Sequence, residues 1–327
     1  MLLPGHDPAA VQAAAQRLAE GELLGLPTET VYGLAARADR DAAVAKVFAA
    51  KGRPADHPLI VHVLDAAGAA PFAAHLPASA RRLMDACWPG PLTVIVPRAP
   101  GVAEAAAGGQ GTIALRAPAH PVARAVLAAA RELGVAGVAA PSANRFGRVS
   151  PTLARHVVDE FGAGLLVLDG GACEVGIESS IVDCSGPHPA LLRPGLIGRA
   201  RIEAALGEPL AAPGAAAPRA SGTLAAHYAP SARLRLLDAG PLALRAAEAA
   251  AAGALEGVAV YSRAPLPAWR WQAMPADPAA AAHELFAVLR LLDAAGAREI
   301  WVEAPPRDPA WEGVRDRLGR AAAAFTD

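Results

Sequence analysis

Polar side chains gather directly after an apolar run near the start of the chain, and a rare lysine follows them. The run ends at Leu26-Pro27, and Thr28, Glu29 and Thr30 come next. Of the 30 Lys and Arg residues, two are lysines and 28 are arginines, and one of those lysines lies in Lys51-Gly-Arg53-Pro. Since arginine occupies nearly every basic position of this chain, a lysine in its place indicates a position that needs a compact, rotatable amine. The two segments therefore predict one face of an active site for anionic substrates.

Three further polar clusters fall at the ends of expected strands or in turns. They are Lys51, Arg53, His57 and His62; Thr112, Arg116, Ser142, Asn144 and Ser150; and Glu178, Ser179, Ser180 and Arg193. Strand ends are the usual place for ligand sites in α/β sheets. Their cations suit phosphate or carboxylate, which arginine can bind with two hydrogen bonds. Walker A, GxSxG and HExxH motifs are absent from the sequence, so a bound nucleotide would need a different cradle.

Each cluster also has an ordinary structural interpretation. The threonines, serine and asparagine could simply shape turns. The Lys51–Arg53 pair could be helix C-terminal cations that face the helix dipole. His62 could be a core histidine within a strand. The combination of the clusters, and no single one of them, favours an active site.

Length and composition restrict the class of protein. A chain of 327 residues with 54% hydrophobic residues can fill two packed domains. No apolar run reaches the ~20 residues of a membrane helix, and no export signal is expected. Three cysteines (Cys87, Cys173 and Cys184) without a CxxC pair indicate thiols in a reducing cytoplasm. A net charge of -1 provides no overall attraction to nucleic acid.

The order of the expected elements divides the chain. Up to about residue 209, strands and helices mix without strict alternation, which predicts an open, mixed α/β sheet. Residues 210–231 are rich in Ala, Pro and Gly, as is typical of a linker. Strands at 234–237, 258–261 and 299–303 then alternate with helices, which predicts a small parallel Rossmann-like domain. That domain has no glycine-rich phosphate fingerprint, so no dinucleotide is assigned to it.

Several of these segments resemble the YrdC-like domain of the threonylcarbamoyl-AMP synthase family. The family signature KxR…SxN matches Lys51-x-Arg53 and Ser142-x-Asn144, and the segments 26–33 (LPTETVYG), 57–59 (HPL), 141–144 (PSAN) and 178–183 (ESSIVD) also match. His227-Tyr228-Ala-Pro and the domain after it resemble the longer, two-domain family form. The resemblance implies a twisted, open, mixed α/β catalytic domain over 1–209, a linker over 210–231 that closes over the active site, and a Rossmann-like domain over 232–327.

The resemblance also implies a reaction. L-Threonine, bicarbonate or CO2, and ATP would give L-threonylcarbamoyladenylate and pyrophosphate, as in a nucleotidyltransferase (adenylyltransferase) of tRNA processing. The product would pass to the threonylcarbamoyl transferase complex, which makes N6-threonylcarbamoyladenosine in tRNA. Two anions must meet when the carbamate of threonine attacks the α-phosphate, so fixed cations and Mg2+ would offset their repulsion. Mg2+ bound with ATP is the expected cofactor, without a bound transition metal. The cytoplasm is the expected location, without membrane attachment.

Matched positions imply the residue roles. The threonine site would comprise Thr30, His62, Arg116, Ala140 and Ser179, with Arg116 taking the carboxylate. The ATP site would comprise Arg53, His57, Thr112, Ser142, Ser150, Arg193 and Tyr228, with Tyr228 closing over it. The signature residues Lys51, Arg53, Ser142 and Asn144 would be catalytic, and no residue is assigned to a metal. The chain departs from a common family form at Ala220-Ser221-Gly222-Thr223, where that form has Ser-Pro-Gly-Met.

Two other functions stay open from the sequence. YrdC-like domains are similar to proteins proposed to bind double-stranded RNA, which would give weak RNA binding here. The near-neutral charge and the lack of a basic run or an aromatic stacking platform argue against that as the main role. A paralogue that uses another carbamoyl-type substrate is the second alternative.

Overall fold

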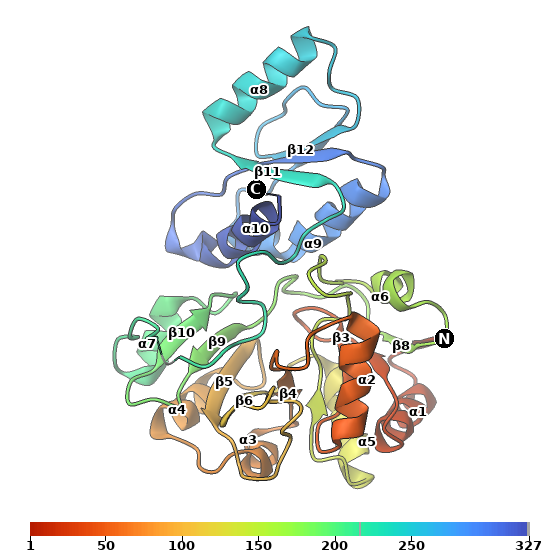
Figure 1. Ribbon diagram of the computed structural model, residues 1–327, viewed down its shortest axis with the longest axis vertical. Helices are drawn as coiled ribbons and strands as arrows, with labels where there is room; N and C mark the ends of the chain where they lie inside the picture. Colours follow the sequence, from red (N-terminus) through yellow and green to blue (C-terminus); the bar gives the residue numbers. More distant parts are fainter. Residues whose placement is uncertain (216, 326–327) are drawn as a thin grey trace. The chain divides into compact units, whose positions relative to one another are not determined.

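The computed structural model describes residues 1–215 and 217–325, which form two compact units (Figure 1). The first unit contains Met1–Phe146 and Ser150–Thr223, and the second contains Gly147–Val149 and Leu224–Asp327. Residues 210–223 of the expected linker therefore belong to the first unit, and residues 224–231 belong to the second.

A large mixed sheet organises the first unit. Within the described residues its ten strands lie in the order β1-β8-β2-β3-β7-β4-β6-β5-β9-β10. The strands are β1 (Leu2–Pro4), β2 (Leu24–Leu26), β3 (Gly33–Arg37), β4 (Ile60–His62), β5 (Leu92–Pro97), β6 (Thr112–Arg116), β7 (Val138–Ala139), β8 (Leu166–Asp169), β9 (Ser180–Asp183) and β10 (Ala190–Arg193). The helices are α1 (Pro8–Ala19), α2 (Asp41–Lys51), α3 (Ala66–Ala69), α4 (Ala78–Cys87), α5 (Pro121–Glu132), α6 (Ala154–Phe161) and α7 (Arg199–Leu206), with a 3-10 turn at Ala70–Phe72.

The two faces of this sheet are covered differently. One face packs on a core that includes Val44 of α2, Leu83 of α4 and Val157 of α6. On the other face, α1 and α5 cover the half that contains β2, β3, β7 and β8. The half that contains β4, β6, β5 and β9 carries only a small apolar cluster, against which Ala220 packs. That part of the face is available for a site.

The second unit is a small parallel α/β sheet. Its described strands, β11 (Arg233–Leu237), β14 (Glu299–Glu303), β12 (Val258–Ser262) and β13 (Arg270–Ala273), lie in this order and are all parallel. Helix α8 (Ala239–Ala251) packs through Leu242 and Ala246 on Val258, Val260 and Trp301. Helices α9 (Pro278–Ala294) and α10 (Glu312–Ala323) lie on the opposite face (Figure 1), and a 3-10 turn at Pro309–Trp311 precedes α10. The expected fold class, an open mixed sheet followed by a small Rossmann-like domain, is confirmed.

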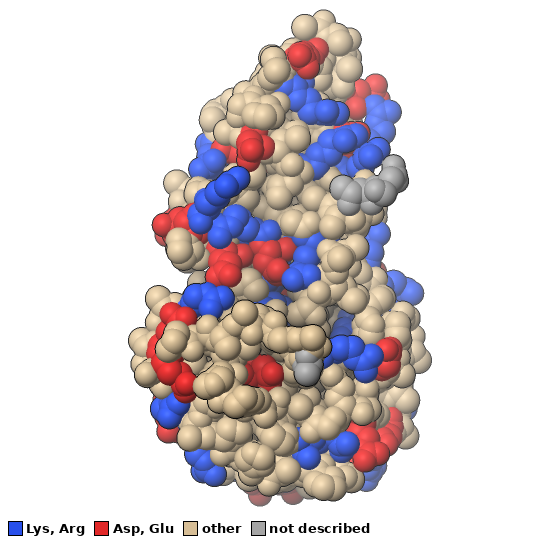
Figure 2. All heavy atoms as spheres, turned by 60° about the vertical axis from the view of Figure 1, so that its left-hand side comes forward, with Lys and Arg blue, Asp and Glu red and all other residues tan. Residues whose placement is uncertain are grey.

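The surface charge and the character of the helices concern two expectations from the sequence, one about nucleic-acid binding and one about membrane attachment. Figure 2 shows basic and acidic groups next to one another over the drawn face, without a continuous basic stripe there. Among the described helices, none combines the length and the apolar character needed to cross a bilayer.

Candidate active site

Side-chain alternation brings the predicted residues to the open half of the sheet face. Strand β4 is parallel to β6, so that His62 pairs with Arg116 and Ile60 with Ala114. Strand β5 runs antiparallel to β6, and Thr93 follows in register beside Arg116. Because neighbouring residues of a strand point to opposite faces, His62, Arg116 and Thr93 share one face. Polar groups thus gather at one end of the sheet face, next to an apolar floor of Ile60, Ile95 and Ile181.

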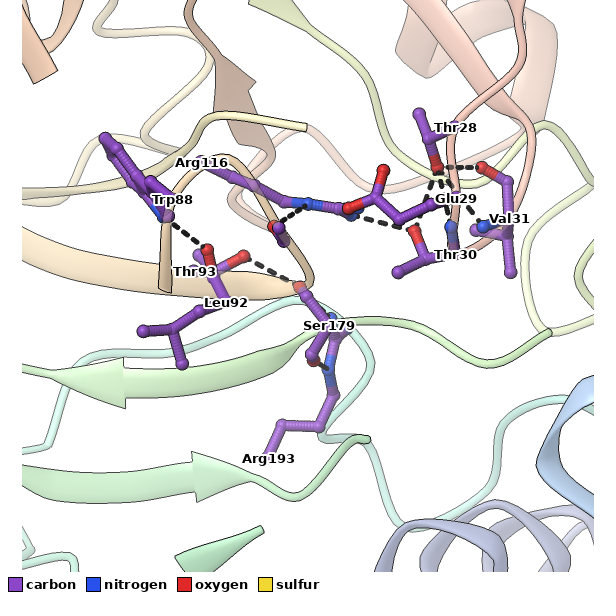
Figure 3. Close-up of polar contacts among 11 residues, drawn as sticks. Thr28, Glu29, Thr30, Val31, Trp88, Leu92, Thr93, Arg116, Ser179 and Arg193 are labelled. Carbon is purple, nitrogen blue, oxygen red and sulfur yellow. Dashed lines mark hydrogen bonds and ion pairs between the residues drawn. The ribbon is translucent and has the colours of Figure 1, made fainter. Parts of the chain in front are cut away.

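Arg116 is the centre of this polar cluster (Figure 3). The residue is 3% exposed, and its guanidinium donates from Nη2 to Glu29 Oε1 at 2.6 Å and from Nη1 to Thr30 Oγ1 at 2.8 Å. Its Nε donates to the carbonyl of Gly90 at 3.2 Å. These contacts use three of the five N–H donors of an arginine, so two donors remain in the described structure. The arginine is held in place by protein groups and can still bind an anion.

The two threonines that follow β2, Thr28 and Thr30, have different structural roles. Thr28 Oγ1 contacts the carbonyl of Val31 at 2.6 Å and accepts from the amides of Thr30 and Val31, at 3.2 and 3.3 Å. Thr28 therefore shapes the turn, as the ordinary structural interpretation expects. It also contacts Thr30 Oγ1 at 2.9 Å, which fixes the hydroxyl that faces Arg116. The turn thus presents Thr30 and Glu29 to the site.

The side chain of His62 is a neutral imidazole near neutral pH. Burial, aided by the charge of Arg116, lowers the pKa of His62 to about 3. Its Nδ1 lies 3.3 Å from the carbonyl of Ile60. Ala140 lies beside it, because its amide donates to the same carbonyl at 3.1 Å. A neutral ring can line a pocket without repelling the cation of Arg116.

The pKa of His62 predicts an acid-sensitive fold. An unfolded histidine takes up a proton near pH 6.5, whereas the folded His62 does so only near pH 3. Stability is therefore lost as the pH falls through this window, by about 1.4 kcal/mol per pH unit, or roughly 2 kcal/mol between pH 6.5 and 5. The free energy of unfolding, measured with urea at pH 7 and at pH 5, should change by roughly 2 kcal/mol less in His62→Asn than in the wild type. Equal pH dependence in the two proteins would contradict the prediction.

Arg193 and Ser179 connect the site to the segment that follows α7. Ser179 Oγ lies 2.7 Å from Thr93 Oγ1. Arg193, 2% exposed, donates from Nε and Nη2 to the carbonyl of Ser179, at 3.0 and 2.8 Å, and from Nη1 to the carbonyl of Ser221 at 2.7 Å. Arg53 Nη2 reaches the Ser221 hydroxyl at 3.4 Å. Ser221 is therefore bound to two arginines of the predicted ATP site, although the sequence left its role open.

Lys51 holds the Ser142–Asn144 turn. Its Nζ donates to the carbonyl of Ser142 at 2.5 Å and to the carbonyl of Asn144. Burial, followed by the charge of Arg53, puts the pKa of Lys51 well below its ordinary value. The two halves of the signature thus meet through the lysine amine and backbone carbonyls, and Lys51 positions the turn.

An aromatic ring completes the predicted ATP side. Phe146 lies 5.3 Å from the His57 ring in an edge contact, and the Arg53 guanidinium lies over it at 5.8 Å. The amide of Phe146 donates to the carbonyl of Lys51 at 2.9 Å, which ties it to the same turn. Thr112 begins β6 on the face of Arg116, about 13 Å along the strand.

Glu178 is a second buried carboxylate of the site. The Ser150 hydroxyl donates to its Oε1 at 2.5 Å. Ser150 thus belongs to the first unit, beside the residues of the 178–183 segment. Sequence inspection noted this glutamate but gave it no role.

Gly195 supports the Glu178–Ser180 segment and gives a test of it. A Cβ there would lie 2.5 Å from the amide nitrogen of Ser180 and 2.8 Å from the carbonyl oxygen of Glu178. Because backbone atoms cannot move aside at a low cost in free energy, Gly195→Ala should destabilise the first unit by roughly 1–3 kcal/mol. It should also reduce catalytic turnover at least tenfold, because Ser179 must move. At Gly198 a Cβ meets nothing within 4 Å. Gly198→Ala is thus a matched control in activity and unfolding assays, and similar losses in both variants would refute this reasoning.

The structure brings most predicted site residues together. Thr30, His62, Arg116, Ala140 and Ser179 surround one end of the face, and Arg53, His57, Ser142 and Arg193 lie on the side of the Lys51 turn and Ser221. Tyr228 belongs to the second unit, where it stacks on Phe286 with ring centroids 5.4 Å apart. Its expected closure over ATP stays a prediction. Four residues that sequence reasoning left without roles also contribute: Glu29, Thr93, Phe146 and Glu178.

The described side chains include no group of three or more His, Cys, Asp or Glu that could hold a metal ion. Mg2+ in nucleotide sites commonly keeps several waters and binds through substrate phosphates and one or two carboxylates. An ion that entered with the nucleotide would neutralise phosphate charge.

Comparisons with known proteins identify the family of the chain. Residues 16–195 match the family model described as "Telomere recombination" (Sua5/YciO/YrdC), and residues 197–323 match "Threonylcarbamoyl-AMP synthase, C-terminal domain". The chain belongs to the threonylcarbamoyl-AMP synthase family. The Bacillus subtilis synthase is 41% identical over 245 residues, which are 73% of this chain and 69% of that protein. The Pyrococcus abyssi synthase is 40% identical over 234 residues, 70% of this chain and 68% of that protein.

A solved member of the synthase family has the same fold over nearly the whole chain. The crystal structure of P. abyssi Sua5 complexed with L-threonine matches with a TM-score of 0.89 and 34% identity, over 97% of this chain and 95% of that one. The family resemblance implied by the Lys51–Arg53 and Ser142–Asn144 signature is confirmed. The RNA-binding alternative is not favoured, since these relatives are synthases.

Proposed function

We propose that the first unit makes L-threonylcarbamoyladenylate and pyrophosphate from L-threonine, bicarbonate or CO2, and ATP. The observation that carries this is the arrangement of charges in the first unit. Arg116 with Glu29 and Thr30 lies at one end, and Arg53 and Arg193 are joined through Ser221 elsewhere on that unit. This arrangement of charges is complementary to an amino acid and to a polyphosphate.

The threonine carboxylate takes the two remaining donors of Arg116. His62, Ala140, Thr30 and Ser179 surround the rest of the amino acid. The apolar floor of Ile60, Ile95 and Ile181 separates this end from Thr112, so ATP extends along the floor and brings its α-phosphate towards the carbamate.

The cations of the ATP side act on the transition state. Attack of the carbamate oxygen on the α-phosphate forms an O–P bond and breaks the bond to pyrophosphate, so negative charge moves to the leaving group. Arg53 and Arg193 stabilise it, and Lys51 keeps the Ser142–Asn144 turn in place beneath the nucleotide. Mg2+ that enters with ATP supplies further charge neutralisation when bound.

The remaining assignments follow from the family. Tyr228 of the second unit closes over ATP, and the product passes to the threonylcarbamoyl transferase complex for tRNA modification. ATP, bicarbonate and tRNA are cytoplasmic, which supports a cytoplasmic enzyme.

The test is pyrophosphate release by the purified full chain. Release from ATP should need both L-threonine and bicarbonate, and it should fall to background when either is left out. Threonine-independent release would assign the chain a different ATP chemistry. Release that is equally fast with serine or valine in place of threonine would favour the alternative of a paralogue with another carbamoyl-type substrate.

A further inference from the structure

Glu29 carries a buried carboxylate oxygen that the protein leaves without a hydrogen bond. The residue is 4% exposed, and its Oε1 accepts from Arg116 Nη2 at 2.6 Å. Its Oε2 is buried and has no hydrogen-bond partner among residues 1–215 and 217–325. Figure 3 shows one carboxylate oxygen turned to Arg116 and the other turned away from it. A buried acceptor left unpaired costs about 1–3 kcal/mol, so a native protein keeps one for a reason.

The carboxylate of Glu29 is ionised. Burial alone would raise its pKa, but the charge and the hydrogen bond of Arg116 outweigh burial and lower the pKa below its ordinary value. The backbone of Glu29 and of Ala119 lowers the pKa further, and Oε2 has no hydrogen-bond partner among the described residues. Oε2 therefore offers negative charge to a donor that the described protein does not supply.

The neighbours of Glu29 define what that donor can be. Arg116 offers two N–H donors to an anion, and Thr30 and a neutral His62 stand beside it. A fixed cation and a fixed anion thus lie side by side, 2.6 Å apart between Nη2 and Oε1. An α-amino acid has the complementary pair, a carboxylate and an ammonium on one carbon. A free phosphate or a simple carboxylic acid would meet the anion of Glu29 unfavourably.

We propose that Oε2 of Glu29 receives the α-ammonium group of the amino acid substrate. This assignment rests on the proposed function and adds the residue that recognises the amine. Carboxylation forms a bond between this nitrogen and the carbon of CO2 and releases two protons to water, so the carbamate nitrogen retains one N–H. The same oxygen then orients the carbamate towards ATP. Glu29 thereby selects α-amino acids over α-hydroxy acids, and it sets the direction from which the carbamate leaves the threonine site.

The competing interpretation is that Glu29 only positions Arg116. Both interpretations predict that loss of Glu29 weakens threonine binding, so activity alone cannot separate them. They differ for a ligand without an amine, such as the dihydroxybutanoate of matching stereochemistry, in which a hydroxyl replaces the amine of threonine. A positioning role affects both ligands equally, whereas an amine contact affects only threonine.

The experiment is calorimetric titration of the full chain with threonine and with this α-hydroxy analogue. The wild type should bind threonine roughly 10- to 100-fold more tightly, the range for a hydrogen bond between charged groups. In Glu29→Gln, which keeps the size and an acceptor for Arg116, the preference should fall below about threefold while ATP binding persists. Glu132, an exposed carboxylate of the same unit, gives the control Glu132→Gln, which should keep the wild-type preference.

Each result decides the matter. A wild type that binds both ligands equally overturns the amine contact without any variant, even if Glu29→Gln fails to fold. A Glu29→Gln protein that weakens both ligands by the same factor overturns it in favour of a positioning role. A wild type that binds ATP but neither ligand overturns the proposed function itself.

Discussion

Replacing Arg116 by methionine should reduce threonine-dependent pyrophosphate release by roughly hundredfold or more. The change removes the cation that we assign to the substrate carboxylate, and loss of one member of a buried charge pair typically costs 2–5 kcal/mol in binding, of order 30- to 5,000-fold. It also leaves the 5% exposed Glu29 carboxylate without its cation, which should destabilise the first unit by about 3–5 kcal/mol. Pyrophosphate assays at threonine concentrations below saturation and thermal unfolding measure the two effects.

A matched pair and a double variant sharpen this prediction. Arg82 forms an exposed pair with Glu208, in which the side chains are 46% and 37% exposed, so Arg82→Met should cost at most about 1 kcal/mol and leave activity intact. The double variant Glu29→Gln with Arg116→Met should regain stability over Arg116→Met, because no buried charge is left alone. It should not regain activity. A double variant that is less stable than Arg116→Met would contradict the account of the pair.

Replacing Lys51 by methionine should also reduce turnover by roughly hundredfold, although Lys51 is a positioning residue. The carbonyl of Asn144 would lose the Lys51 amine as a buried donor, at about 1–3 kcal/mol, and the carbonyl of Ser142 would keep only the amide of Asn144. The turn would relax, and a shift of about 1 Å in a site of this kind can cost 10²-fold in rate. The measurement is pyrophosphate release together with the ATP concentration that gives half-maximal rate, which should rise.

Lys46 is the control for this prediction. Its amine binds the carbonyl of Gly21 and an exposed Glu22 carboxylate, so Lys46→Met should be nearly neutral. The arginine variants test the sequence argument about scarce lysine. Arginine at 46 has room and should be tolerated, whereas arginine at the 3% exposed position 51 should overpack the turn and fail to restore activity. Equal activity of Lys51→Arg and Lys46→Arg would refute that argument.

The sequence predicted a site because polar residues interrupt apolar strands at their ends. The pattern around His62 and Arg116 predicted strand ends, and strand pairing places both on one face, where Arg116 donates a hydrogen bond to Thr30. The pairing of Glu29 with Arg116 could not be predicted, because 87 residues separate them and strand order decides which ends meet. Nor could the carbonyls beneath Lys51 be predicted, since backbone acceptors leave no trace in residue type.

The strands were predicted unevenly for a related reason. Strand β3 reads Gly-Leu-Ala-Ala-Arg, and alanine favours helix over strand, so local sequence did not reveal it. Its neighbours β2 and β7 decide its state. Strand β13 was missed because it lies at the edge of the second sheet, and all four of its residues (Arg, Trp, Gln and Ala) are exposed or half-buried. Tertiary pairing overrides propensity at both places.

The strand order of the first unit has a consequence for how the enzyme is made. Strand β1 pairs with β8, 165 residues later at Leu2 and Val167, and β5 pairs with β9 across almost ninety residues. Contacts of such high sequence separation slow folding, because the chain entropy must be lost before the pairing is gained. During synthesis, Arg116 and its neighbours therefore cannot complete the site until Ser179 and Arg193 have been made. An N-terminal fragment that ends before Arg193 cannot form the whole site. The nascent chain exposes unpaired strand edges during that interval, which is when it most needs protection from aggregation.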